Sequence, residues 1–363
     1  MLAEKFGSAL DFLKTKPPSL IGVDISSTAV KLVELSDAGK GTYKLERYTI
    51  EPLPKDVVTD GNIANLDQVS DAVKRAWKRL GSRNRNLALA LPAAMVITKK
   101  IIVPPGQREE ELELTVEAEA NQYIPFALDE VNLDFQILGP APANPDEVEV
   151  LIAASRKEKV EDRVAIAEAA GLRPRVMDVE SYATQEALRL IMPSLPANGR
   201  DQNIALVDIG AHVTHFYVLR NNQFLFSRDQ AFGGNQLTLD IQRAFNLSPE
   251  EAESAKKSQG LPENYDSDVL QPFMETLALE VTRALQFFFT STSHNQVDQI
   301  ILAGGCSLLP GLDELVAKRA GIATLIANPF ASMAASDKIR PRQIAQDAPL
   351  LLIACGLALR SFE

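Results

Sequence analysis

Two segments of this chain, separated by 184 residues, share a pattern that restricts the folds open to it. In each, an apolar run ends in an aspartate, small or polar residues follow, and an alternating run returns. The two segments are VDISSTAVKLVEL (23–35) and VDIGAHVTHFYVL (207–219). Each predicts a β-hairpin with a tight turn. Their separation is too long for a solenoid repeat, so we predict two similar half-molecules that share a cleft.

The turns of both hairpins have the composition of a phosphate-binding site. Tight turns of small residues present successive backbone N–H groups to an anion, and glycine lets the backbone approach a ligand closely. Hydroxyl groups and one lysine add further donors. The candidate phosphate-binding residues are Ser26, Ser27, Thr28 and Lys31 in the first hairpin, and Gly210 and Thr214 in the second.

Asp24 and Asp208 occupy the same position in the two hairpins. Their carboxylates repel phosphate, so a role in the site requires a cation between the like charges. Mg²⁺ is often bound by one or two carboxylates and keeps several of its own waters, and we predict that both aspartates bind it through water. The alternative is that each aspartate only caps its turn, which is the better interpretation of one hairpin alone.

A third motif, ILAGGCSLLPGL (301–312), predicts a strand that runs into glycines and is followed by a helix. Bare backbone at Ala303, Gly304 and Gly305 lets a planar base lie against the loop. Glycine-rich turns have many other uses, but as the third member of this set the motif is the expected adenosine pocket.

Composition argues against several classes of protein. The net charge of −11 and the pI of about 5.0 disfavour nucleic-acid binding. Only Cys306 and Cys355 are present, without a CxxC pair, which favours a reducing cytosol over a disulfide framework or a zinc site. The first residues do not read as a signal peptide. The apolar run at 350–359 is ten residues long, and a membrane-spanning helix needs about 20, so we expect a soluble protein.

Between the hairpins, the segment at 89–171 predicts a compact α+β subdomain inserted into the first half. A strand, AMVITKKIIVP, leads to an acidic helix at 107–122. Two strands, VNLDFQIL and EVEVLIAAS, follow on either side of a proline-rich loop, GPAPANPD, and a helix at 156–170 ends at Gly171. The loop composition favours a subdomain over a linker.

The first residues have apolar side chains at helical spacing before Pro17 and Pro18. They are either an amphipathic hook for a membrane or partner, or a frayed helix that caps the body, which we favour. The expected units are 1–18 (N-terminal amphipathic segment), 19–88 (first domain), 89–171 (insert), 172–200 (return to the first domain and connecting helix), 201–227 (second domain), 228–299 (its helical subdomain), 300–335 (its adenosine side) and 336–363 (second connecting helix).

In this order, the three motifs resemble the phosphate-1, phosphate-2 and adenosine motifs of the superfamily of actin, heat-shock ATPases and sugar kinases. Longer segments, including EAEANQYIPFALDEVNLDF, FGGNQLTLDIQRAFNLSPEEAESAKKSQGLPENYDSDVL and LIACGLALRSF, resemble the FtsA family and, more closely, the PilM family of type IV pilus inner-membrane assembly proteins. The resemblance covers nearly the whole chain. It implies an α/β fold of duplicated actin-like (ribonuclease H-like) domains around a nucleotide cleft, with a small α+β inserted subdomain.

The resemblance also implies site residues. It assigns Asp24, Ser26, Ser27, Thr28 and Lys31 to phosphate-1, Asp208, Gly210 and Thr214 to phosphate-2, and Gly233 and Gly234 to a turn that faces the phosphates. It assigns Glu253 and Lys256, one helical turn apart, to the ribose, and Gly304, Gly305, Ser307 and Leu309 to the adenosine loop. Residues 180–184 and 354–356 fall in two connecting helices that hinge the halves.

ATP and Mg²⁺ are the cofactors that the resemblance implies. The implied partner is the N-terminal cytoplasmic peptide of PilN, held in a groove between the first domain and the insert. This places the chain in the cytoplasm at the inner face of the inner membrane, with membrane association mainly through its partners. Pilus motor ATPases and the platform protein are further implied partners, and no nucleic acid is expected.

Hydrolysis of ATP is expected to be slow. Many members of the superfamily have glycine where this chain has Ser26, which makes the first turn tighter. No residue stands out as a catalytic base, and Asp178, Glu180 and Gln185 are candidates by location alone. We therefore expect at most a weak ATPase. The alternatives are a small-molecule kinase, which predicts phosphate transfer, and an actin-like filament former, which predicts polymers with ATP.

His212 and His215 are three residues apart and superficially resemble a metal-binding pair. Residues three apart on a strand point to opposite faces of the sheet. Shared metal binding by the two histidines is therefore not expected.

Overall fold

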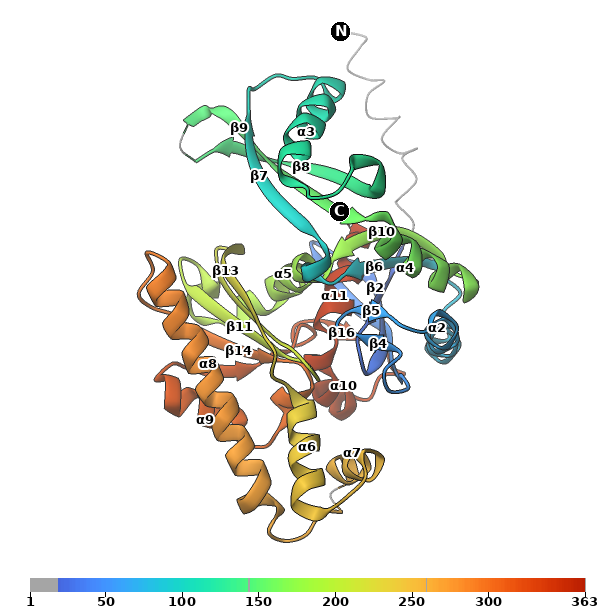
Figure 1. Cartoon of the computed structure of the whole chain (residues 1–363), viewed down its shortest axis with the longest axis vertical. Coiled ribbons are helices and arrows are strands. Elements are labelled where there is room, and N and C mark those ends of the chain that lie inside the picture. Colours follow the sequence, from blue (N-terminus) through green and yellow to red (C-terminus); the bar gives the residue numbers. More distant parts are fainter. Residues whose placement is uncertain (1–18, 143, 259, 363) are drawn as a thin grey trace.

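The structure is a computed structural model that describes residues 19–142, 144–258 and 260–362. Figure 1 shows two domains side by side, with a small subdomain at one end and helices α6 (Gly234–Phe245) and α7 (Pro249–Ser258) at the other. The segment 1–18, for which the sequence predicts an amphipathic helix, lies outside the described residues.

The first domain contains a six-stranded sheet in the order β10-β6-β1-β2-β3-β16. Its strands are β1 (Ile21–Ile25), β2 (Ala29–Gly39), β3 (Thr42–Pro52), β6 (Asn86–Leu91), β10 (Arg173–Val179) and β16 (Ala334–Ala335). β1 is buried along its whole length, as expected for a continuous apolar strand covered on both faces. A separate two-stranded ribbon is formed by β4 (Val58–Thr59) and β5 (Asn62–Ile63).

The second domain repeats this arrangement in a five-stranded sheet, β13-β12-β11-β14-β15. Its strands are β11 (Asn203–Ile209), β12 (Thr214–Arg220), β13 (Gln223–Gln230), β14 (Gln299–Ala303) and β15 (Thr324–Ile326). In both sheets three consecutive antiparallel strands are followed, next to the first of them, by two parallel strands. The duplication that the repeated hairpins predict and the α/β fold class that the resemblance implies are therefore confirmed.

Helices cover the outer face of each sheet. α2 (Leu66–Leu80) and α4 (Lys157–Ala169) pack on the first sheet, and α8 (Gln271–Ser291) and α9 (Leu312–Ala320) pack on the second. A single π-helical turn at Asp266–Leu270 precedes α8.

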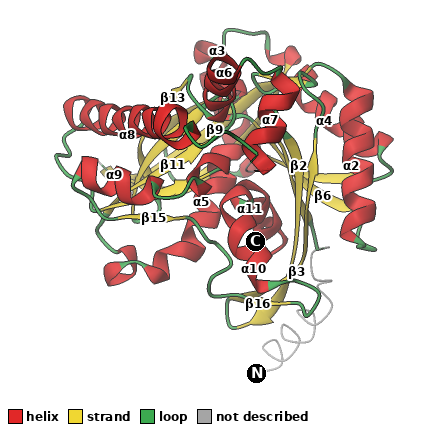
Figure 2. Ribbon diagram, turned by 90° about the horizontal axis from the view of Figure 1, so that it is seen from below, coloured by secondary structure: helices red, strands yellow, loops and turns green. Residues whose placement is uncertain are grey.

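Two further helices, α5 (Glu180–Ile191) and α11 (Leu352–Leu359), lie between the sheets and share one core with both (Figure 2). Their backbones touch, because a Cβ atom at Gly356 would lie 1.7 Å from the carbonyl oxygen of Ala183. In the same way, a Cβ atom at Gly22 of β1 would lie 2.0 Å from the carbonyl oxygen of Ala354. These two glycines set the spacing between the connecting helices and the first sheet.

The insert is a three-stranded antiparallel sheet in the order β7-β9-β8, with one helix on it. Its elements are β7 (Ile97–Val103), α3 (Glu109–Tyr123), β8 (Val131–Ala141) and β9 (Asn144–Arg156). Buried side chains of α3 and β9, such as Val116 and Val150, make a core separate from those of the two domains.

The proline-rich loop that the sequence predicts in the insert is mostly strand. β8 continues to Ala141 and β9 begins at Asn144, and these two residues pair with each other. β8 is an edge strand, where Pro140 is tolerated because its missing N–H leaves no ladder bond unmade. The register shifts beside Gly139, which accommodates the irregular residues.

α4 contributes its buried apolar side chains to the core of the first domain, although the expected unit at 89–171 includes it in the insert. Ile166 and Ala167 are fully buried in the core of the first domain. Arg163 is also buried, and its guanidinium donates to the carbonyl oxygens of Ala90, at 2.9 Å, and Gly61, at 3.0 Å. The insert therefore ends with β9.

The C-terminal segment returns to the first domain earlier than the expected boundary at 336, because β16 pairs with β3. α10 (Pro341–Asp347), which the sequence prediction omits, precedes α11. α11 begins at Leu352, after a 3₁₀ turn that contains Pro349. Within the described ranges no single helix is long and apolar enough to cross a membrane, although one bent pair, Pro341–Leu350 and Leu352–Phe362, meets the criteria by length and composition.

Candidate functional site

The first hairpin carries an ion pair at its end. β1 and β2 place Asp24 opposite Lys31, and the Lys31 Nζ atom lies 2.8 Å from Asp24 Oδ2. Asp24 is 3% exposed. Burial pushes the pKa of Lys31 down, but the charge and hydrogen bond of Asp24 outweigh burial, so that this pKa is raised. Lys31 therefore stays charged and holds a nearly buried carboxylate.

The second hairpin carries a histidine at the matching position. β11 and β12 place Asp208 opposite His215. The His215 Nδ1 atom lies 2.7 Å from Asp229 Oδ1 on β13. Burial opposes protonation of His215, but the hydrogen bond to Asp229 and the charge of Asp208 raise its pKa to about 9. His215 is therefore a cation at neutral pH, and its Nδ1–H donates to Asp229.

Glu180, the first residue of α5, lies between the two hairpins. Burial raises its pKa to about 7, the charge of Asp24 raises it further, and His215 opposes this rise. Burial also raises the pKa of Asp208, against the nearby charges of His215 and Lys31. These mutual effects show that three carboxylates and two cations from both domains lie close together. We call them the interdomain charge cluster: Asp24, Lys31, Glu180, Asp208 and His215.

Three glycine loops meet beside the second hairpin. The N–H of Gly234 donates to the carbonyl oxygen of Gly210 at 3.0 Å, where α6 begins. A Cβ atom at Gly233 would lie 2.5 Å from that same oxygen. Gly304 has a φ of +79°, and a Cβ atom there would lie 2.6 Å from Asp208 Oδ1. The structure therefore brings the phosphate-2 turn, the Gly233–Gly234 turn and the adenosine loop into contact, and all three need bare backbone.

Three of the hydroxyl groups named by the sequence donate to backbone carbonyls. Ser26 donates to Ala29 at 3.0 Å, within its own turn. Thr214 donates to Phe232 at 2.7 Å, and the fully buried Ser307 donates to Gly304 at 2.7 Å. These side chains shape the loops and do not point a free hydroxyl group at a ligand.

The other residues of the first turn and the adenosine loop are more accessible. Ser27 is half-buried and Thr28 is exposed. Gly305 is exposed, with no atom within 4 Å of where its side chain would begin. Leu309 is half-buried and packs against the core of the second domain. Gly305 thus offers the open backbone surface that a planar base requires.

Glu253 and Lys256 of α7 form an ion pair of 2.7 Å. Lys256 Nζ also donates to the Thr238 hydroxyl at 2.7 Å and to the Gly234 carbonyl at 3.4 Å. The Thr238 hydroxyl donates to Glu253 at 2.8 Å. The pair therefore fastens α7 to the first turn of α6, next to the glycine loops.

Asp24 and Asp208 come from opposite domains, as the predicted shared Mg²⁺ requires. In the part of the chain that the structure describes, no group of three or more His, Cys, Asp or Glu side chains is arranged to hold a metal ion. Two carboxylates without a third ligand fit Mg²⁺ that keeps its waters and is shared with phosphate. They do not fit a site built from protein ligands alone.

Of the candidate catalytic bases, Glu180 alone belongs to the interdomain charge cluster. Asp178 pairs with Arg360 at 2.7 Å, and the side-chain amide of Gln185 donates to the carbonyl of Asn222. His215 is a member of the charge cluster that is absent from the predicted site residues. Aligning the two hairpins would have found it, because Lys31 and His215 each lie seven residues after the aspartate.

His212 and His215 do not lie on one strand, contrary to the sequence-based prediction. His212 lies in the turn before β12, which begins at Thr214, so only His215 is on a strand. The two histidines are separated by a change of backbone direction and not by the alternation of a strand.

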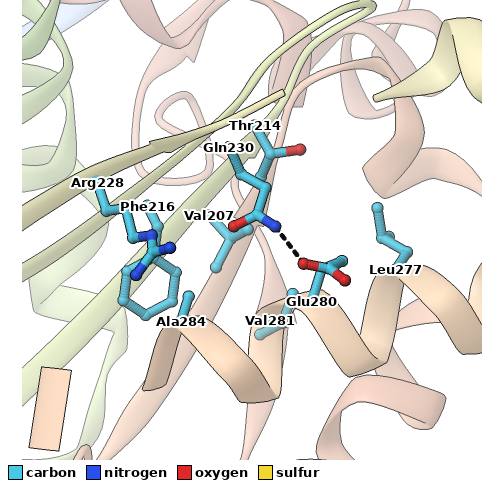
Figure 3. A pocket seen from close by; sticks show the side chains of 9 residues that line it. All are labelled: Val207, Thr214, Phe216, Arg228, Gln230, Leu277, Glu280, Val281 and Ala284. Carbon is cyan, nitrogen blue, oxygen red and sulfur yellow. Dashed lines mark hydrogen bonds between the residues drawn. The ribbon is translucent and has the colours of Figure 1, made fainter. Parts of the chain in front are cut away.

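A small cavity lies on the opposite face of the second sheet (Figure 3). Its volume of about 10 Å³ is near the minimum for one water molecule. Gln230 donates to Glu280 of α8 at its edge. The lining residues are Val207, Thr214, Phe216, Arg228, Gln230, Leu277, Glu280, Val281 and Ala284. The cavity is too small for a nucleotide. It lies between the second sheet and α8, and none of the residues of the interdomain charge cluster line it.

The duplicated sheets, the connecting helices between them and the charge cluster at their junction define an actin-like protein. A solved archaeal actin homologue, Ta0583 in complex with ADP, has the same fold with a TM-score of 0.50 and 13% identity, over 94% of this chain and 99% of that one. A family model described as type IV pilus assembly protein PilM matches residues 22–362, so the chain belongs to the PilM family. The family that the sequence motifs suggest is confirmed.

Two further similarities agree with this. A solved PilM–PilN type IV pilus biogenesis complex contains a chain with a TM-score of 0.78 and 31% identity, over 95% of this chain and 99% of that one. The cell division protein FtsA of Bacillus subtilis is 26% identical over 251 residues, which is 67% of this chain and 52% of FtsA. The match thus spans about half the length of this curated relative.

Proposed function

We propose that this chain is an ATP-binding scaffold of type IV pilus assembly that holds the N-terminal cytoplasmic peptide of PilN. The observation that carries the proposal is the interdomain charge cluster, in which two cations and three carboxylates from both domains lie beside three glycine loops. Such a site recognises an anionic ligand that also brings a metal cation.

In this proposal, Lys31 and His215 attract the phosphates from opposite sides. Asp24 and Asp208 bind Mg²⁺ through its waters, which neutralises the like charges of carboxylate and phosphate. The open backbone at Gly305 faces the base, and the pair Glu253–Lys256 faces the ribose. The ADP bound by the archaeal actin homologue, which shares the fold, supports this assignment.

Nucleotide binding, and not turnover, is the proposed role of the site, with at most weak ATPase activity. A general base must reach the attacking water and have a pKa suited to its task. Asp178 and Gln185 are engaged by Arg360 and Asn222. Only Glu180 remains in position, and it also faces the charge of Asp24.

The proposed peptide site is the groove between the first domain and the insert. The insert carries most of the large apolar side chains that the described surface exposes, which is the property of a partner-binding region. These side chains are Ile102, Leu114, Tyr123, Phe126, Ile137 and Leu138. The solved PilM–PilN complex supports the choice of partner. A peripheral place at the inner face of the inner membrane, and contacts with pilus motor ATPases and the platform protein, complete the proposal.

The test is a titration of the purified chain with a fluorescent N-terminal PilN peptide, and separately with a fluorescent ATP analogue and Mg²⁺. We expect saturable binding of both. In Asp24→Ala and Asp208→Ala, the affinity for the Mg²⁺–nucleotide complex is expected to fall about 10–100-fold, as for lost metal contacts.

Asp37→Ala, an exposed acidic residue on β2 away from the turn, is the matched control and should leave nucleotide affinity unchanged. Unchanged affinity in both Asp24→Ala and Asp208→Ala would refute the nucleotide site. Failure of the peptide to bind, with or without nucleotide, would refute the scaffold role.

A further inference from the structure

Three strands of the first sheet begin at an edge that the proposed nucleotide site does not use. β1 and β6 are parallel, with Ile21 opposite Leu87. β6 and β10 are also parallel, with Asn86 opposite Arg173. Asp24 lies near the other end of β1. The residues that precede these three strands therefore meet on the side of the sheet away from the interdomain charge cluster.

This edge is strongly basic, although the chain as a whole has a net charge of −11. The sequence contains no aspartate or glutamate between Asp71 and Glu109. α2 ends at this edge, because a short turn leads from Leu80 into β6. The exposed carboxylate of Glu168, near the end of α4, opposes only part of the charge. Six exposed cations, which we call the basic edge, lie here: Lys74, Lys78, Arg83, Arg85, Arg173 and Arg175.

Neutral groups hold two of these arginines in place. The indole N–H of Trp77 donates to the carbonyl oxygen of Asn84 at 2.8 Å, and the guanidinium of Arg85 lies 5.3 Å from the centre of the Trp77 ring. The guanidinium of Arg175 donates to the side-chain oxygen of Asn86 at 3.4 Å. An aromatic face and an amide oxygen orient a cation without cancelling its charge.

The carboxylates of the adjoining strands are already paired with other cations. Glu51 on β3 forms ion pairs with Arg75 and Arg79 of α2, at 2.8 and 3.0 Å. Glu34 on β2 forms one with Arg47, at 3.2 Å. No member of the basic edge forms an ion pair with another residue in the described part of the chain. Its charge is therefore available to an external anionic partner.

The chain enters the first domain at this same edge. Ser19 is exposed, and its carbonyl oxygen accepts a hydrogen bond from the side chain of Asn84 at 2.8 Å. Asn84 lies between two arginines of the basic edge. In sequence, the segment 1–18 has apolar residues at helical spacing and three lysines against two acidic residues. Amphipathic segments bind bilayers more strongly when anionic lipids attract nearby cations, so the two features support each other.

We propose that the basic edge is a docking surface for a membrane with anionic lipid headgroups. Clusters of about four to eight lysines and arginines bind such surfaces. The apolar residues of the segment 1–18 favour a bilayer over a nucleic acid, which offers no apolar interior. The proposal adds a direct lipid contact to the peripheral place in the proposed function, and it requires neither PilN nor nucleotide.

The position of the basic edge is compatible with a ligand in the interdomain charge cluster. Figure 2 shows α2 and β6 on the side of the first domain away from the second domain. A bilayer at this edge contacts neither the interdomain charge cluster nor the glycine loops beside it. We therefore expect Mg²⁺ and ATP analogue to leave the affinity for lipid unchanged.

The experiment is sedimentation of the full-length chain with vesicles. One set contains phosphatidylglycerol mixed with phosphatidylcholine, and the other contains phosphatidylcholine alone. We expect saturable binding to the anionic vesicles only. This binding should weaken as the NaCl concentration rises, because salt screens exposed charges.

Two double variants remove cations of the basic edge from different elements. Lys78→Gln with Arg83→Gln changes α2 and the turn after it, and Arg173→Gln with Arg175→Gln changes β10. Each cation near an anionic bilayer contributes about 5-fold to binding, so each double variant should lose about 25-fold in affinity for the anionic vesicles. If one of them folds poorly by circular dichroism, the other decides.

The matched control is Arg243→Gln with Lys318→Gln, which removes one arginine and one lysine from exposed positions on α6 and α9 of the second domain. It makes the same change in net charge, and its affinity for the anionic vesicles should stay within about 2-fold of the wild type, since screening limits distant charges.

Three results would overturn the inference. They are equal binding to both sets of vesicles, wild-type affinity in the folded double variants of the basic edge, and equally tight binding of a short double-stranded DNA, which would indicate a surface for polyanions in general. None of these results affects the titrations with PilN peptide and nucleotide, so the proposed function is tested separately.

Discussion

The two hairpins place a cation at the same register position but use it differently. Asp24 opposes Lys31, and Asp208 opposes His215. Lys31 binds the aspartate directly opposite, whereas His215 pairs with Asp229 on the next strand. An unperturbed lysine keeps its charge up to about pH 10, and an unperturbed histidine only up to about pH 6.5. The duplication has therefore kept the position of the charge, but the charge of His215 depends on the neighbouring carboxylates that raise its pKa.

The turns of the two hairpins also differ, because the first is open to solvent and the second is enclosed by neighbouring loops. The first turn is closed by bonds of Ser26 to Ala29, and its Thr28 is exposed. The second turn is covered by the Gly233 and Gly304 loops. Both glycines lie so close to the backbone of this turn that a Cβ atom at either position would clash with it. One half of the site thus has a fixed charge and an open turn, and the other has a titratable charge and an enclosed turn.

The largest expected effect comes from removing the fixed cation. Lys31→Met leaves the nearly buried Asp24 carboxylate without its partner, which we expect to cost about 3 kcal/mol of unfolding free energy. His215→Gln should cost less than Lys31→Met, because the hydrogen-bonded partner Asp229 is 45% exposed and is solvated by water. Urea unfolding at pH 7, followed by circular dichroism, measures both.

Asp24→Asn combined with Lys31→Met is the control, and it should recover more than half of the loss, because no unpaired charge remains. Equal costs for Lys31→Met and His215→Gln would show that the two hairpins do not differ in the way proposed.

The next effect is on the pH dependence of stability. Because the folded state raises the pKa of His215 from 6.5 to about 9, its stabilising contribution is complete below pH 6.5 and is lost as the pH rises to about 9. Glu180, raised from 4.5 to about 7, loses its contribution earlier, as the pH rises through 7. Between pH 7.5 and 9.5 the urea midpoint of the wild type should therefore fall, and that of His215→Gln should fall less.

The control for this measurement is His212→Gln, in the exposed part of the turn. Its pH profile should match that of the wild type. A wild-type profile that is flat above pH 7.5 would contradict a charged His215 in the folded state.

The smallest effect is expected from making the first turn resemble the second. Ser26→Gly removes the hydroxyl bond to Ala29, worth about 1 kcal/mol at most, and keeps the backbone bond between the same residues. If the tight first turn limits turnover, phosphate release from ATP should rise in this variant. Ser27→Gly, one residue further along, is the control for added backbone freedom. A rate unchanged in Ser26→Gly would remove this explanation for the proposed slow hydrolysis.

Much of the site is local in sequence, and that part could be predicted. An aspartate at the end of an apolar run, followed by small polar residues, predicts that its side chain lies at the end of a hairpin strand. A pair of glycines after a strand predicts a loop whose backbone is open to a ligand. The pairing of His215 with Asp229 could not be predicted in this way. It depends on the register of β12 with β13, which shifts between Val218 and Leu219, and no local pattern sets that shift.

The fold shows the same limit. The helix at 157–169 is clear from its pattern, but its pattern does not say which sheet its apolar face will meet. The structure packs Ile166 on the first domain. β16 consists of Ala334 and Ala335 alone, and two residues carry no strand signal. Which sheet a helix packs against, or which sheet a short strand joins, depends on tertiary packing. The periodicity of the sequence does not predict it.

The attachment of the insert has an evolutionary consequence. Its two junctions with the first domain are adjacent, since the hydroxyl of Ser155 at the exit donates to the carbonyl of Met95 at the entry, at 2.9 Å. Arg163, just beyond the exit, is bonded to Ala90, just before the entry. A unit with its own core and neighbouring ends can be replaced without rebuilding its host. Recombination can therefore exchange such a unit while the two duplicated halves pass unchanged from ancestor to descendant.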